Sequence, residues 1–205
     1  MRSAPLLSTL NHAIHHPVRT FIANAVKAEA SRLQVLAFVD ARWGIAGSRA
    51  QTRQLMADVV TSYISGVPDL LDAFTRAATN YQLDPLILPS LQKAGGYFLS
   101  PPGCLIRYPL LHALFAEAYL AHRLCEEIGD IVEARFGRTL APYELTRINV
   151  IAHSLLGDAL AEELETYTAE EVARFRARCE QGVQPQVSDV SLENCAWRDR
   201  DVVYH

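Results

Sequence analysis

Apolar residues recur every three or four positions along most of the chain, and no stretch shows the strict alternation of a half-buried β-strand. A short amphipathic segment, Pro5–Ile14, is followed by a longer periodic stretch from Pro17 to about Trp43. Proline fits the first turn of a helix, and Gly44 follows the last periodic residue. This pattern predicts an all-α protein.

Short breaks delimit the next helices. Ser48 is a suitable N-cap for a helix that ends near Ser65. Proline-containing turns then introduce helices at Leu70–Tyr81 and Leu86–Phe98. The strongest break in the chain is the Ser-Pro-Pro-Gly sequence at Ser100–Gly103, which separates these helices from a longer helical pair.

That pair predicts a helical hairpin with arms at Tyr108–Phe136 and Pro142–Tyr167, followed by a last helix at Thr168–Gln181. If the arms pack antiparallel about a turn near Leu140, three pairs of ionisable residues come level. These pairs are Glu117 with Glu163, His122 with Asp158, and Glu126 with His153. Ionisable groups in a core are costly unless they are paired, protonated or bound to a metal, so the hairpin is the best candidate for a functional site.

The same residues supply donors for a metal. Helical bundles that hold two iron or manganese ions use inward carboxylates together with histidines. We expect the metal ligands to be Glu117, His153, Asp158 and Glu162, and the residues next to the metal or its substrate to be Glu29, His122 and Glu126. A structural interpretation stays open, because Arg107, Arg123 and Arg147 could neutralise such acids.

Several motifs between residues 11 and 165 occur in an order that is typical of one superfamily. They are His16-Pro17-Val18 before a long helix, Ser65–Phe74 with its Gly-Val-Pro-Asp-Leu core, Gln82–Pro85, a mid-chain Glu117, and His153–Asp158. This order resembles the heme-oxygenase-like helical superfamily, which includes thiaminase-II-like proteins, pyrroloquinoline-quinone synthase and the heme-oxygenase-like di-iron oxidases.

The resemblance implies one heme-oxygenase-like bundle of about seven helices, over residues 1–181, with a pocket for a small organic molecule. It also implies a metal-dependent oxidoreductase in which iron or manganese activates dioxygen. However, the family's histidine before Pro-Glu-Leu is Val67 here, and Ala161 or Glu162 stands in place of the last histidine of the ligand run. Two alternatives therefore remain: a metal-free protein that binds or hydrolyses a small molecule, and a non-enzymatic interaction protein.

The composition of the chain indicates which classes of partner and cofactor to expect. The net charge of −4 argues against nucleic acid, which requires a concentrated basic surface. No P-loop or dinucleotide fingerprint is present, so we expect no nucleotide cofactor, and no apolar run is long enough to cross a membrane. Four cysteines without Cys-x-x-Cys spacing fit a reducing cytoplasm. We expect a cytoplasmic protein with a small-molecule ligand, leave a homodimer open, and expect residues 182–205 to form an extended or disordered tail.

Overall fold

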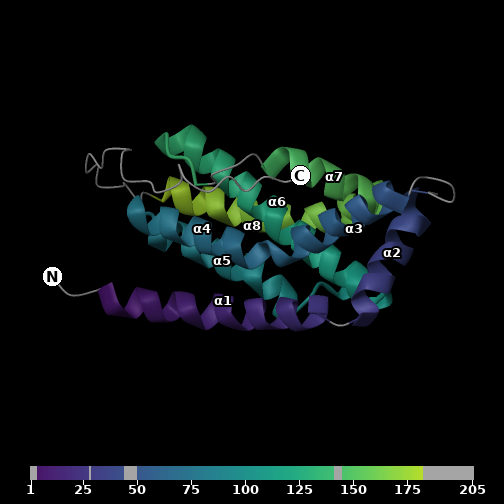
Figure 1. Cartoon of the computed structure of the whole chain (residues 1–205). Helices are drawn as coiled ribbons and strands as arrows, with labels where there is room; N and C mark the ends of the chain where they lie inside the picture. The colour runs from purple at the N-terminus through teal and green to yellow at the C-terminus, as the bar shows by residue number, and fades with distance from the viewer. Residues whose placement is uncertain (1–3, 28, 44–49, 141–144, 182–205) are drawn as a thin grey trace.

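The described residues of the chain are helical, and the predicted all-α class is confirmed. The computed structural model describes residues 4–27, 29–43, 50–140 and 145–181, with side chains for residues 16–27, 34–41, 51–140 and 145–181. Eight α-helices and one short 3-10 helix lie within these ranges, compared with about seven expected (Figure 1). The expected tail at 182–205 lies outside the described residues.

The helices follow one another with short connections. In chain order they are α1 (Ala4–Lys27), α2 (Glu29–Trp43), α3 (Ala50–Ser65), α4 (Val67–Asn80), α5 (Asp84–Leu99), the 3-10 helix η1 (Gly103–Arg107), α6 (Leu110–Phe136), α7 (Leu145–Leu156) and α8 (Asp158–Glu180). The helices from α3 to α6 lie close to their predicted positions. Differences occur at the two ends of the chain.

The first difference concerns Pro17. A helix boundary was predicted there, but α1 continues through Pro17 and ends at Lys27, and α2 then begins at Glu29. Val18 and Ile22 follow the proline and are buried in the core, whereas Pro17 itself is exposed. Packing of this apolar face therefore outweighs the helix-breaking tendency of an interior proline.

The second difference concerns the hairpin's second arm, which was predicted as one helix over Pro142–Tyr167. The arm instead breaks at Gly157, whose φ of 83° and ψ of 148° are accessible almost only to glycine. Helix α8 then runs through Thr168, where a new helix was predicted, because the Thr168 hydroxyl bonds the Glu165 carbonyl within the helix at 2.9 Å and does not cap a new one.

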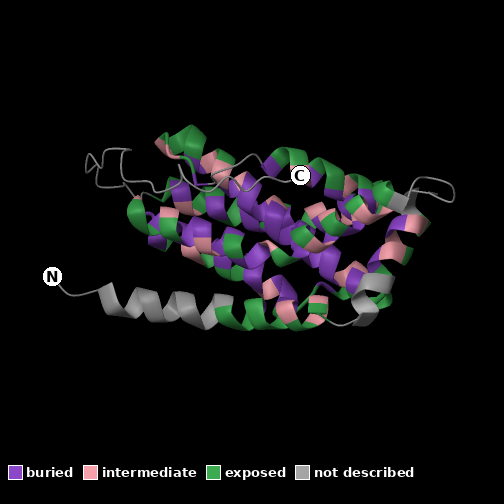
Figure 2. Ribbon diagram, in the orientation of Figure 1, coloured by how far each residue is buried: buried purple, intermediate pink, exposed green. Residues whose placement is uncertain are grey.

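Helix α6 is the centre of the bundle. It packs against α2, α3, α4, α5, α7, α8 and η1. All residues from Leu114 to His122 are buried, so both faces of the helix are covered, and buried residues gather along the middle of the bundle (Figure 2). This enclosed stretch has no solvent-facing side for its polar groups. Its polar residues must therefore find partners on neighbouring helices or be buried in uncharged form.

The break between α7 and α8 depends on the backbone of Gly157. We expect Gly157→Ala to lower the free energy of unfolding by about 1–3 kcal/mol, because a Cβ strains this conformation. The control is Gly96→Ala within α5, where an added Cβ meets no atom within 4 Å. Alanine should stabilise that position by about 0.5–1 kcal/mol. Urea unfolding measures both, and equal effects would contradict the argument.

Candidate functional site

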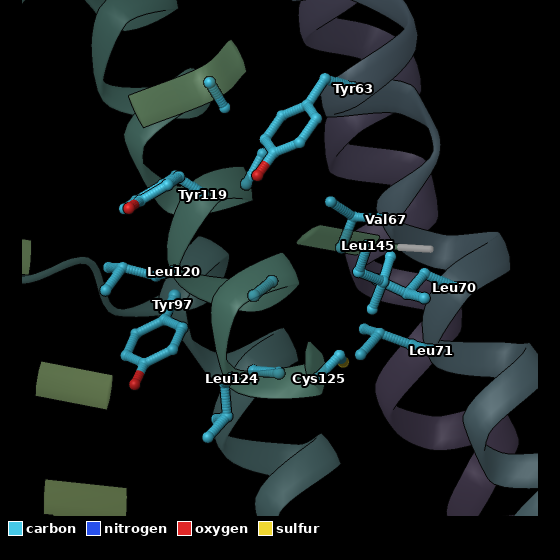
Figure 3. Close-up of a cluster of buried hydrophobic side chains, with 14 of the residues drawn as sticks. Tyr63, Val67, Leu70, Leu71, Tyr97, Tyr119, Leu120, Leu124, Cys125 and Leu145 are labelled. Atoms are coloured by element: carbon cyan, nitrogen blue, oxygen red, sulfur yellow. The ribbon is translucent and has the colours of Figure 1, made fainter. Parts of the chain in front are cut away.

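A chain of buried hydrogen bonds links α3, α6 and α7. The Tyr63 hydroxyl donates to Asn149 Oδ1 at 2.6 Å, and Asn149 Nδ2 donates to Glu126 Oε2 at 2.6 Å. Arg123, one turn before Glu126, forms an ion pair with the same carboxylate. Tyr63 and Tyr119 lie among the buried side chains where these helices meet (Figure 3). The side chains of Tyr63, Asn149 and Glu126 each have a partner in this chain, which is the condition for burying them at low cost.

His122 lies beside this chain and is held in one orientation. Its ring stacks on Tyr63, with centroids 4.0 Å apart and an interplanar angle of 17°. Its Nε2 lies 3.2 Å from the Tyr63 carbonyl oxygen and donates to it, while Nδ1 has no hydrogen-bond partner among the described residues. Burial lowers the His122 pKa to about 4. His122 is therefore neutral at pH 7 and keeps a lone pair on Nδ1.

A second polar array joins α6, α7 and α8 nearer the surface. The Tyr119 hydroxyl lies 2.6 Å from Glu165 Oε1 and 3.1 Å from His153 Nδ1. The other ring nitrogen of His153, Nε2, lies 3.3 Å from Asp158 Oδ1. About a third of the His153 and Glu165 side chains is exposed, so solvent reaches the array.

One arrangement of protons satisfies both contacts of the Tyr119 hydroxyl. The hydroxyl donates its single proton to Glu165 through the shorter contact. If His153 Nδ1 carries a proton, it donates to the Tyr119 oxygen, and Nε2 keeps the lone pair of the ring. Burial, and next the hydrogen bond to Glu165, raise the pKa of Tyr119, so the phenol remains protonated. Asp158 is placed to accept a hydrogen bond once Nε2 takes up a proton.

Glu117, the best predicted metal ligand, is buried in the core of α6. Only 4% of the residue is exposed, and Oε2 has no hydrogen-bond partner among the described residues. Burial raises the Glu117 pKa to about 8. The carboxyl is therefore mainly protonated at pH 7, which is how an acid without a partner avoids burying a charge.

The described contacts do not include the three predicted level pairs. Glu163 binds Arg107 at 2.9 Å, and Asp158 contacts His153. Glu126 contacts Asn149, which lies one helical turn before the expected partner His153. The expected register assumed one continuous second arm, and the break at Gly157 invalidates that assumption.

The predicted metal ligands do not converge. Asp158 has 87% of its side chain exposed and Glu162 is also exposed, whereas Glu117 is buried in the core. Among the described residues no group of three or more His, Cys, Asp or Glu side chains is placed to hold a metal ion. These residues do not fit the expected metal site. Iron or manganese stays a prediction, and the side chain of Glu29 lies outside the described residues.

The structure adds two residues that sequence reasoning missed, Asn149 and Glu165. Asn149 precedes His153 by four positions and so shares its helix face, which is a signal available from the sequence. Glu165 joins the array because α8 bends away at Gly157 and returns to α6. No spacing along the chain indicates that return.

A groove between α6 and α8 adjoins the array. Its volume is about 530 Å³, which lies in the range of small-molecule sites. The lining residues are Arg123, Glu127, Glu165, Thr168, Ala169, Val172, Ala173, Arg176, Ala177 and Glu180. Arg123 and Glu165 belong both to the groove and to the polar contacts described above, so a ligand in the groove would reach the array.

Comparison of the chain with family models, with curated proteins and with solved structures gave no match. Among the described residues, no helix combines the length and the apolar character needed to cross a bilayer. The function must therefore be inferred from the residues of the site itself.

Glu117 should make stability depend on pH. Its pKa is raised from 4.5 to about 8 by folding, so its contribution is fully present below about pH 4.5 and is lost as pH rises through about 8. We expect the free energy of unfolding of the wild type to fall by about 2–4 kcal/mol between about pH 5 and about pH 8.5. The Glu117→Gln variant should not show this fall. Glu163→Gln, a change at a half-exposed carboxylate, is the control. Parallel pH curves for wild type and Glu117→Gln would refute the assignment.

Asn149 holds the buried chain of hydrogen bonds together. Asn149→Ala should lower the free energy of unfolding by about 2–4 kcal/mol, because it leaves Glu126 and Tyr63 with lost partners in the core. The control on the same helix is Ser154→Ala, whose hydroxyl is exposed and bonds only the Val150 carbonyl. Chemical denaturation gives both values. A loss no larger than that of the control would show that the chain is not stabilising.

Proposed function

We propose that the protein binds a small organic molecule where the groove between α6 and α8 meets His153, and hydrolyses it by acid–base chemistry. The observation that supports this function best is the array in which the Tyr119 hydroxyl lies 2.6 Å from Glu165 Oε1 and 3.1 Å from His153 Nδ1, so that the proposed hydrogen-bond order runs from His153 Nδ1–H through Tyr119 to Glu165. That order places the basic lone pair on Nε2, the nitrogen next to Asp158. An oriented histidine that solvent can reach is a common general base.

Each member of the array has a separate role in this proposal. His153 Nε2 removes a proton from a water molecule as the water attacks the substrate, and later returns that proton to the leaving group. Asp158 stabilises the transient imidazolium through Nε2–H. Tyr119 and Glu165 are positioning residues that fix the ring and its tautomer, as the third member of a catalytic triad does.

Arg123 keeps the acidic surroundings in place. Its two terminal nitrogens bind Glu126 and Glu127, and its Nε lies 3.8 Å from Glu165. The guanidinium is partly buried, and the neighbouring carboxylates keep its pKa raised against the opposing effect of burial. Arg123 thereby reduces the repulsion among three acids that would otherwise disfavour folding of this region.

The test is hydrolysis of a panel of small activated esters and amides by the full chain. We expect His153→Gln to reduce kcat/KM by about 10²–10⁴-fold and Tyr119→Phe to reduce kcat with little change in KM. The control is Ser154→Ala, which changes an exposed neighbour on α7. Hydrolysis that is equal in wild type and His153→Gln would contradict the proposal.

A metal-dependent oxidoreductase is the second candidate, supported by the resemblance and by the unpartnered buried carboxyl of Glu117. A bound iron or manganese ion would supply dioxygen activation. Metal analysis after anaerobic iron loading separates the two functions. Stoichiometric metal that is lost in Glu117→Ala would favour the oxidoreductase. Metal content that does not respond to Glu117→Ala would count against it.

A further inference from the structure

The groove carries unequal charge along its length. At the end near the array, Glu127 and Glu165 line the groove beside the single guanidinium of Arg123, which also pairs with the buried Glu126 behind the lining. Three carboxylates against one cation leave this end negative. Its most exposed acceptor is Glu165, which has only the Tyr119 hydroxyl as a hydrogen-bond donor among the described residues. A protonated amine would donate hydrogen bonds to Glu165 and offset the negative charge of this end of the groove.

The other end of the groove offers a positive charge. Arg176 and Glu180 both line it, and Arg176 is exposed and makes no ion pair or hydrogen bond with the described residues, Glu180 included. Guanidinium groups bind carboxylates with two parallel hydrogen bonds, so Arg176 suits a carboxylate better than a neutral group. The two ends of the groove therefore differ, because carboxylates outnumber cations near the array, whereas the other end offers a guanidinium without an ion-pair partner among the described residues.

Helix geometry sets the distance between these charges. Glu165 and Arg176 are separated by about three turns of α8, so they share one face and lie roughly 16 Å apart along the axis. The long Arg176 side chain leans toward the N-terminus of its helix and shortens this span. The lining between them consists of small apolar side chains, those of Ala169, Val172 and Ala173. An extended aliphatic or peptide segment can lie there.

We infer that the groove binds an elongated zwitterion, with its ammonium group at Glu165, its carboxylate at Arg176, and an aliphatic or peptide spacer over the alanines. The inference rests on the proposed function, because it names the class of molecule that would be brought to His153. Short linear peptides and ω-amino carboxylates share this chemistry. A bound amine at Glu165 would lie beside the Tyr119–His153 contact.

Isothermal titration calorimetry on the full chain tests the inference with three probes: ω-aminooctanoate, octylamine and octanoate. We expect the wild type to bind the zwitterion at least about tenfold more tightly than either singly charged analogue. Arg176→Gln should bind ω-aminooctanoate no more tightly than octylamine. Glu165→Gln should bind ω-aminooctanoate no more tightly than octanoate. Arg147→Gln, a change at an exposed arginine of α7 outside the groove, is the control and should keep both advantages.

Equal affinity for the three probes, no binding of the zwitterion, or an unchanged preference in Arg176→Gln would each overturn the inference. None of these results alters hydrolysis that depends on His153, so failure of the ligand class is distinguishable from failure of the proposed function. Conversely, His153→Gln should keep the zwitterion preference, since this ring lies outside the groove lining. Arg176 is exposed, so its replacement does not endanger the fold.

Discussion

Because the middle of α6 is enclosed by neighbouring helices, each polar side chain that is buried there needs a partner inside the protein or must give up its charge. Both outcomes occur on this one helix. Glu126 has partners in Arg123 and Asn149, whereas burial holds Glu117 in its protonated form and His122 in its neutral form. Burial of α6 thus sets the protonation state of its interior side chains. A buried charge without a partner loses more free energy by desolvation than it gains from its surroundings, so the uncharged form is favoured.

The same constraint separates the structural part of the polar interior from the part that can react. The chain from Tyr63 through Asn149 to Glu126 is buried and internally satisfied, so it stabilises the packing of α3, α6 and α7. The array around His153 lies where α6 reaches the edge of the core, and solvent and the groove both approach it. Function is therefore best sought at this boundary and not at the deeply buried Glu117.

The sequence predicted the helices whose apolar faces are uninterrupted, and α6 is the clearest example. It also singled out Glu117, His122, Glu126 and His153 as unusual, because ionisable residues in an apolar helix are visible without a structure. Their partners were not predictable, since the backbone at Gly157 redirects the chain and changes the register of every residue after it. A positive φ at one glycine depends on tertiary packing, and hydrophobic periodicity does not reveal it.

The proposed hydrolysis requires that Tyr119 fix the tautomer of His153 and leave Nε2 as the base. Nitrogen NMR of the histidine rings at a pH where His153 is neutral measures this directly. We expect a proton on His153 Nδ1 in the wild type, and a shift of the population toward the Nε2–H form in Tyr119→Phe. A proton on Nε2 in the wild type, unaffected by Tyr119→Phe, would contradict it.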